Sequence, residues 1–401
     1  MSFGNVPYRT LLGLPGVTGQ AVLGFLAQLT QQVAPVGIVL VVQYASGSLA
    51  LAGVTAGAFS VGAGMGRPVH GRLMDRRGPG PVLAATALVH TAALVVLAVL
   101  AGGDLPSWVM VALAWLAGAG LPPISLSMRI AWGRRMADSG RTAAYSLVYL
   151  VQELAFLIGP LVFGLLIAAG TSAPGGAAPE TVESSSLALV VVAVAAGLGT
   201  LAFARALGAG PVTETRDRGR VFADRRMLVL VSVALLLGGV FGALQVGLPA
   251  LAAARDAPAA TGLLVAALSL GGIAGAAVYG ARSWTSSPAV RLVGLMLALG
   301  VVVAPLVLIE ALPVVWIGLF AGGLALNPAV TTTSLLVDEF APAAQAEAFG
   351  WVSTAIGMGG AVGSGVAGVT GEGHGASAPF LAAAAFALVG AGLALTLRGR
   401  G

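Results

Sequence analysis

The chain has 401 residues, of which 58% are hydrophobic and only 9% are charged, and its mean hydropathy is +0.97. A soluble domain carries roughly 25% charged residues, so this composition excludes a soluble globular protein. Cysteine is absent and the three histidines are scattered, which excludes disulfides and thiolate metal sites and leaves no convincing metal centre. We therefore predict an integral membrane protein without a metal or other cofactor.

Twelve long apolar runs follow one another along the chain, separated by polar or Pro/Gly-rich breaks. Each approaches or exceeds the ~20 residues that a helix needs to cross a bilayer, and none alternates in polarity as the strands of a membrane barrel do. The sequence therefore predicts an all-α membrane protein with about 12 transmembrane helices. The predicted spans are 15–43, 48–70, 80–101, 107–131, 143–169, 186–207, 227–252, 259–281, 289–309, 313–337, 346–369 and 378–397.

The charges predict the orientation of these spans. All 20 basic residues are arginines, and with the N-terminus inside, 19 of them fall in inner loops and helix ends, while the outer loops hold only Arg255. Positive charge is enriched on the cytoplasmic side of membrane proteins. We therefore predict cytoplasmic N- and C-termini in a multi-pass protein of the inner (plasma) membrane. The net charge of +5 then indicates arginines that face the anionic membrane surface. It does not indicate nucleic-acid binding, because no large domain lies outside the bilayer.

The first predicted span is rich in amide side chains. Gln28 and Gln32 are four residues apart and therefore share one helix face. These amides serve either substrate contact or hydrogen bonding between helices.

A charged loop follows the second span, and four of its residues form a pattern: Gly71, Asp75, Arg76 and Gly78. Gly71 permits close helix contact, and Asp75 can face an arginine or the positive end of a helix, expected to be the eleventh. Such a contact could be a two-state latch; the alternative is an ordinary inner loop. The pattern resembles the signature loop of the major facilitator superfamily, although Pro79 and Gly80 replace its last two basic residues.

This resemblance implies the superfamily's fold, two pseudo-symmetric six-helix bundles that work by alternating access. It also implies that helices 1, 4, 7 and 10 line a central cavity. Much of the amide and hydroxyl content lies on these four helices, so each such side chain is either a substrate contact or a packing contact. The cavity candidates are Gln28, Gln32, Ser125, Gln245, Asn327 and Thr331.

The fifth span carries Glu153 about ten residues from its start, near the expected bilayer midplane. A charge at that depth is costly and is by default a functional candidate. Glu153 is therefore the candidate for proton coupling or for binding a cationic substrate. The alternative is a structural ion pair, for example with Arg129, or a lipid-facing position.

The same span carries Gly159, Pro160 and Gly164. Small residues let helices approach closely, and proline kinks a helix. The spacing resembles the Gly-Pro signature of exporters and antiporters in the superfamily, with Phe163 in place of one glycine. A second exporter feature, an arginine early in the fourth span, is absent, because Ala114 stands at the nearest matching place.

The chain also repeats itself. A shift of 209 residues superposes glycines of the second span on the eighth, and shifts of 205 and 204 align the fourth with the tenth and the fifth with the eleventh. Repeats of this kind are typical of transporters that bind substrate near the midplane. We predict an N-terminal six-helix bundle over 1–207, a cytoplasmic linker over 208–226 and a C-terminal six-helix bundle over 227–401.

These features favour a secondary transporter and not an enzyme. No nucleotide-binding loop is present: the glycine-rich 62–66 lies within a span and follows no strand. The leading hypothesis is proton-coupled export of a small neutral or apolar molecule by a monomer in the lipid bilayer. The alternatives are an uptake carrier for a sugar or other metabolite and a membrane sensor or scaffold that transports nothing.

Overall fold

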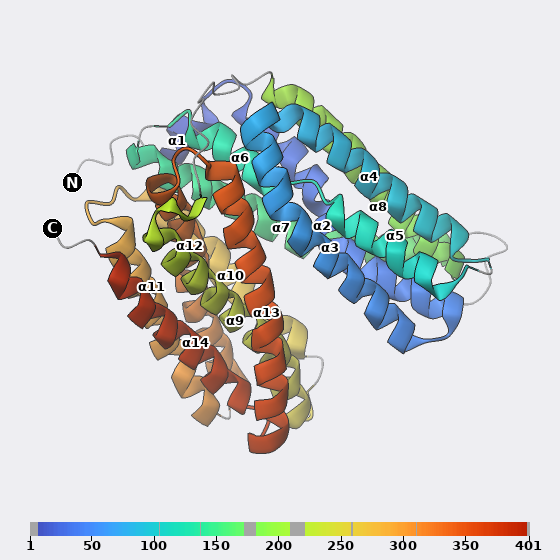
Figure 1. The fold of residues 1–401 in the computed structure, drawn as a ribbon. Helices are drawn as coiled ribbons and strands as arrows, with labels where there is room; N and C mark the ends of the chain where they lie inside the picture. Colours follow the sequence, from blue (N-terminus) through green and yellow to red (C-terminus); the bar gives the residue numbers. More distant parts are fainter. Residues whose placement is uncertain are drawn as a thin grey trace. The chain divides into compact units, whose positions relative to one another are not determined.

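The structure, a computed structural model, describes residues 7–103, 105–136, 138–171, 182–208, 221–257, 260–309 and 311–398. Throughout these ranges the regular elements are helices (Figure 1). Eleven of the described helical stretches are long and apolar enough to cross a membrane. The remaining predicted span is α3 (Leu49–Arg77), 29 residues long, whose last turn carries Arg76 and Arg77. The all-α prediction is confirmed, while the side of the membrane that the termini occupy stays a prediction.

Two compact units account for the packing of the described residues. One, the N-terminal unit, is drawn from Leu14–Ala131 and Val151–Glu214; the other, the C-terminal unit, is drawn from Met1–Gly13, Trp132–Leu150 and Thr215–Gly401. Residues 132–150 therefore pack with the second half of the chain. Most of the predicted linker, 209–220, lies outside the described residues.

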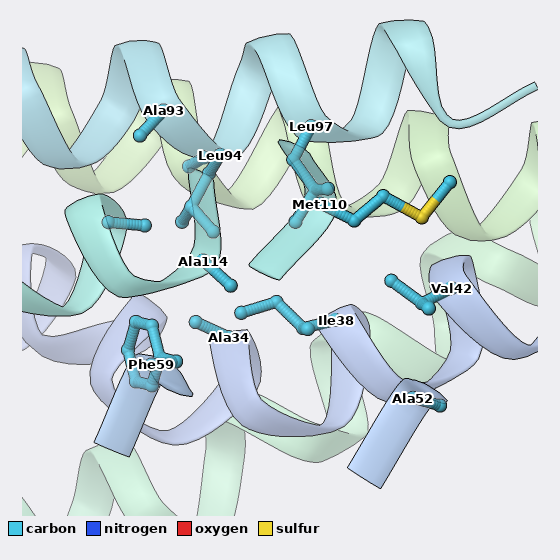
Figure 2. Close-up of a cluster of buried hydrophobic side chains, with 12 residues drawn as sticks. Ala34, Ile38, Val42, Ala52, Phe59, Ala93, Leu94, Leu97, Met110 and Ala114 are labelled. Carbon is cyan, nitrogen blue, oxygen red and sulfur yellow. The ribbon is translucent and has the colours of Figure 1, made fainter. Parts of the chain in front are cut away.

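The N-terminal unit is a bundle in which α2 packs on α8, α3 on α5 and α4 on α8. Its core is a cluster of buried apolar side chains in which Ile38 of α2 and Leu94 of α4 are fully shielded (Figure 2). The helices of this unit are α2 (Val17–Ser46), α3, α4 (Pro79–Leu100), α5 (Ser107–Ala119), α6 (Ile124–Gly133), α8 (Val182–Leu207) and the later part of α7 (Asp138–Thr171).

The predicted fourth span, 107–131, is confirmed as the membrane-length stretch Ser107–Gly133, but the helix is interrupted within it. It is divided into α5 and α6 by an irregular segment that includes Pro122 and Pro123. A residue before proline is disfavoured in the α conformation, and each proline lacks a backbone N–H, so two adjacent prolines interrupt the helix. The single Pro328 at the repeat-related position leaves α12 (Leu312–Phe340) continuous.

The C-terminal unit is also helical, with α9 packed on α13 and α14, α12 on α10 and α11, and α11 on α14. A short helix at the start of the chain, α1 (Pro7–Leu12), was not predicted and packs on α10. The other elements are η1 (Val221–Ala223), α9 (Arg225–Ala254), α10 (Ala260–Ala281), α11 (Pro288–Val303), η2 (Ala304–Leu308), α12, α13 (Gln345–His374), α14 (Ala378–Ala394) and η3 (Leu395–Leu397).

The same helix contact is built twice, once in each unit. In α5, a β-carbon added to Gly118 would collide with the carbonyl oxygen of Phe59 in α3. In α12, a β-carbon on Gly323 would collide with the carbonyl oxygen of Leu268 in α10. The two pairs are related by the sequence shifts of 209 and 205 residues, so the predicted repeat is confirmed at the level of backbone contact. Such close approach requires glycine, as at small-residue interfaces in membranes.

Candidate functional site

Two predicted cavity residues meet in the N-terminal unit. Gln28 on α2 is 2% exposed, and its Oε1 accepts a hydrogen bond of 2.7 Å from Oγ of Ser125 on α6. Nε2 of Gln28 donates to the Gly24 carbonyl at 3.0 Å and approaches Sδ of Met128 at 3.8 Å. The break after α5 lets α6 restart with Ser125 at its beginning, so the helix interruption places this hydroxyl beside the amide.

A second polar contact lies one helical turn further along α6. Arg129 is 5% exposed, and its Nη2 donates to Oε1 of Gln152 on α7 at 3.3 Å. Glu153, the predicted coupling residue, follows Gln152 and is half-buried. The structure therefore gives Gln152, which the sequence did not single out, as a partner of Arg129. Glu153 is the next residue along α7. A buried arginine in a membrane helix marks this region as functional by default.

The predicted signature loop is largely helical, because Gly71, Asp75 and Arg76 lie in the last turns of α3 and only Gly78 separates α3 from α4. Gly71 is buried, Asp75 is half-buried, and Arg76 is exposed. Gly78 ends α3 with φ 77° and ψ 166°, a backbone conformation that favours glycine, and α4 starts at the next residue, Pro79. The backbone conformation between the two helices explains why glycine stands at position 78. The role of Asp75 as a switch stays a prediction.

The predicted Gly-Pro motif lies inside α7, which continues through Pro160. Gly159 is buried, whereas Pro160 and Gly164 are exposed. A β-carbon added to Gly164 would contact nothing within 4 Å, so Gly164 is not held by close packing. Its antiporter role stays a prediction.

Three of the remaining cavity candidates lie in the C-terminal unit. Asn327 is 3% exposed on α12, where its amide occupies the space that a β-carbon on Gly272 of α10 would need. Thr331 is fully buried, and its Oγ1 has no hydrogen-bond partner in the described part of the chain. Gln245 is exposed on α9, and the side chain of Gln32 lies outside the described residues.

The sequence did not single out a polar cluster around Asp338, at the end of α12. The carboxylate accepts hydrogen bonds from Oη of Tyr145 and, at 3.1 Å, from Nε2 of Gln345. Nη1 of Arg141 lies 4.0 Å from the same carboxylate. The available signal was the pair of carboxylates, Asp338 and Glu339, in the last turn of a span whose other polar residues are uncharged. The first part of α7 is therefore held to α12.

These arrangements describe two chemical environments inside bundles of apolar helices. The N-terminal unit offers an amide, a hydroxyl and a guanidinium group, from Gln28, Ser125 and Arg129. The C-terminal unit offers Asn327 and the buried hydroxyl of Thr331. Within the described residues, no three His, Cys, Asp or Glu side chains gather as metal ligands.

Membrane-length helices, a helix contact repeated in two units and a polar interior with few charges define a helical membrane transporter of the repeat-built class. The family model of the Major Facilitator Superfamily matches residues 21–346. The chain belongs to this superfamily, whose members are transporters.

Solved structures share this fold at low sequence identity. The chain is similar to the human organic anion transporter MFSD10 (TETRAN), with 18% identity, TM-score 0.73 and coverage of 94% of this chain and 99% of that one. It is similar to the transporter FucP in its outward conformation, with 13% identity, TM-score 0.74 and coverage of 98% and 100%. A bacterial homologue of the iron transporter ferroportin matches with 15% identity, TM-score 0.71 and coverage of 96% and 99%. No curated protein sequence matches the chain.

Proposed function

We propose that this protein is a proton-coupled exporter of a small neutral or apolar molecule, working by alternating access as a monomer in the plasma membrane. The observation that carries the proposal is the placement of Glu153. It is half-buried in α7, directly after Gln152, which accepts a hydrogen bond from the buried Arg129. A carboxylate in this position can take up a proton from one side of the membrane and release it to the other.

The chemistry of the polar groups supports a neutral substrate. Gln28 and Ser125 can each both donate and accept hydrogen bonds, and they already bind one another at 2.7 Å. A substrate with a hydroxyl, carbonyl or amide group can replace this internal bond at little cost, because the lost hydrogen bond is exchanged for a similar one.

Export is favoured by the pattern of Gly159, Pro160 and Gly164 in α7, which resembles the antiporter signature. Sugar uptake is the alternative with a specific observation behind it. Amide and hydroxyl groups such as those of Gln28 and Ser125 are also sugar-binding groups, and the proton:xylose symporter XylE shares the fold at 12% identity with TM-score 0.70. The two functions differ in the direction of proton and substrate flux.

Purified protein in proteoliposomes tests the proposal with a panel of apolar compounds and sugars, with and without an imposed pH gradient. We expect an apolar compound to move against the direction of proton flow, and Glu153→Gln to abolish gradient-driven flux while retaining substrate exchange. Glu183→Gln is the matched control, because Glu183 is an exposed carboxylate at the start of α8.

Two results contradict the proposal. Normal gradient-driven transport by Glu153→Gln rules out this residue as the coupling group. Movement of a sugar in the same direction as protons, with no flux of apolar compounds, establishes the uptake alternative.

A further inference from the structure

The turn between α10 and α11 places two arginines around one tryptophan. The guanidinium carbon of Arg282 lies 4.9 Å from the centre of the Trp284 ring, and that of Arg291 lies 5.5 Å from the same ring. Arg291 is also 5.5 Å from the ring of Tyr279, whose centre is 4.8 Å from that of Trp284. We call Tyr279, Arg282, Trp284 and Arg291 the arginine–tryptophan cluster.

A chain of hydrogen bonds fixes the inner side of this cluster. Nη1 of Arg291 donates to Oη of Tyr279 at 2.8 Å, and this oxygen is 2.7 Å from Oγ1 of Thr332 on α12. Thr332 is fully buried and donates its own proton to the Pro328 carbonyl at 2.7 Å, so Tyr279 is the donor to Thr332. Nε1 of Trp284 donates to the Tyr279 carbonyl at 2.9 Å. The cluster is therefore pre-organised by α12.

The positive charge of the cluster is not neutralised within the described part of the chain. No described carboxylate lies within 4.0 Å of Arg282 or Arg291, and the buried Nε of Arg291 has no acceptor there. Arg291 also sits in the opening turn of α11, which contains no acidic residue. The helix dipole makes this end positive, so a cation is disfavoured and an anion is favoured at this position.

The position of the cluster selects the kind of anion. It lies where α10 ends at Ala281 and α11 begins at Pro288, and both helices belong to membrane-length spans. Tryptophan and arginine are typical of the bilayer surface, and guanidinium groups bind phosphate with two parallel hydrogen bonds. We propose that the arginine–tryptophan cluster binds the phosphate of an anionic phospholipid headgroup in the leaflet that faces this turn.

Binding of defined lipids to the delipidated, detergent-solubilised full chain tests the proposal by native mass spectrometry. We expect phosphatidylglycerol to bind more tightly than phosphatidylcholine, and inorganic phosphate not to compete at equal concentration. Each of Arg282→Gln and Arg291→Gln is expected to weaken phosphatidylglycerol binding about fivefold, since an arginine near an anionic surface contributes about 1 kcal/mol. Arg282 is exposed, so its variant is expected to fold normally.

The matched control is Arg205→Gln, which removes an exposed arginine from the last turn of α8 and is expected to leave lipid affinity unchanged. Equal binding of phosphatidylglycerol and phosphatidylcholine overturns the proposal, and so does wild-type affinity in the Arg282→Gln variant. Competition by inorganic phosphate overturns the lipid assignment and identifies a site for soluble anions.

Discussion

Tyr145 on α7 donates a hydrogen bond to the carboxylate of Asp338 on α12. The contact matters because α7 belongs to both units: its residues up to Leu150 pack with the C-terminal unit and those from Val151 onward with the N-terminal unit. Within the C-terminal unit, this hydrogen bond ties the first part of α7 to α12.

Loss of the Asp338 carboxylate is expected to loosen the first part of α7. A hydrogen bond to a charged group contributes about 1.5–3 kcal/mol, so Asp338→Asn should raise the population of the released form roughly tenfold or more. Ser146 reports this release, because it is fully buried on α7, and the chain has no native cysteine. We expect the maleimide labelling rate of Ser146→Cys to rise by a similar factor when Asp338→Asn is added.

Glu339→Gln is the control for that measurement. Glu339 is the next residue on α12, but it is half exposed and pairs with Arg226 at 3.5 Å, outside the contact with Tyr145. Equal labelling rates in the Asp338→Asn and Glu339→Gln backgrounds show that the Tyr145–Asp338 contact does not hold α7.

The repeated glycine contact predicts matched losses of stability in the two units. Gly118→Ala and Gly323→Ala each force a methyl group against a backbone carbonyl oxygen, and overpacking of this kind costs about 1–3 kcal/mol. Gly57→Ala and Gly262→Ala are the controls, because a β-carbon at either position would meet nothing within 4 Å. Thermal unfolding in detergent should show lower midpoints for Gly118→Ala and Gly323→Ala than for the two controls. Equal midpoints for all four variants contradict the close contact.

The bond between Gln28 and Ser125 predicts non-additive effects on transport. Gln28→Ala and Ser125→Ala each remove one side of the same 2.7 Å hydrogen bond. If the pair acts as one binding element, each single variant raises the KM for the transported compound and the double variant raises it little further. Initial rates of flux in proteoliposomes give the comparison. Strictly additive effects show that the two side chains act independently.

Tyr8 predicts a dependence of stability on alkaline pH. Its hydroxyl donates to the Ala276 carbonyl at 2.8 Å, and burial raises the pKa of Tyr8 to about 12. The folded protein therefore keeps this proton at pH values where the unfolded chain loses it, near its ordinary pKa of 10. The stabilisation is complete below pH 10 and is lost as the pH rises through about 12.

The check for Tyr8 is Tyr8→Phe. The variant should be less stable by about 0.5–1.5 kcal/mol at neutral pH, and its stability should fall less steeply than that of the wild type between pH 10 and 12. Chemical unfolding followed across this pH range measures both effects. Identical pH profiles for the two proteins show that Tyr8 is not buried in the folded state.

The sequence by itself determined the helical membrane fold, because hydrophobic length and the need to satisfy backbone hydrogen bonds in lipid leave few alternatives. It also determined the repeat, since a shift of 209 residues superposes glycines of the second span on the eighth and a shift of 205 aligns Pro123 with Pro328. These are properties of local composition and spacing.

Only the tertiary structure decided which polar side chains meet. Gln28 and Ser125 are 97 residues apart in the chain, and Tyr145 and Asp338 are 193 apart. Hydropathy gives the length of each helix but not its rotation about its axis or its neighbours. The break at Pro122 and Pro123 has a local cause in the two prolines, but the meeting of Ser125 with Gln28 depends on packing between distant segments. The sharing of α7 by two units also arises from such packing, on which the periodicity of a single helix carries no information.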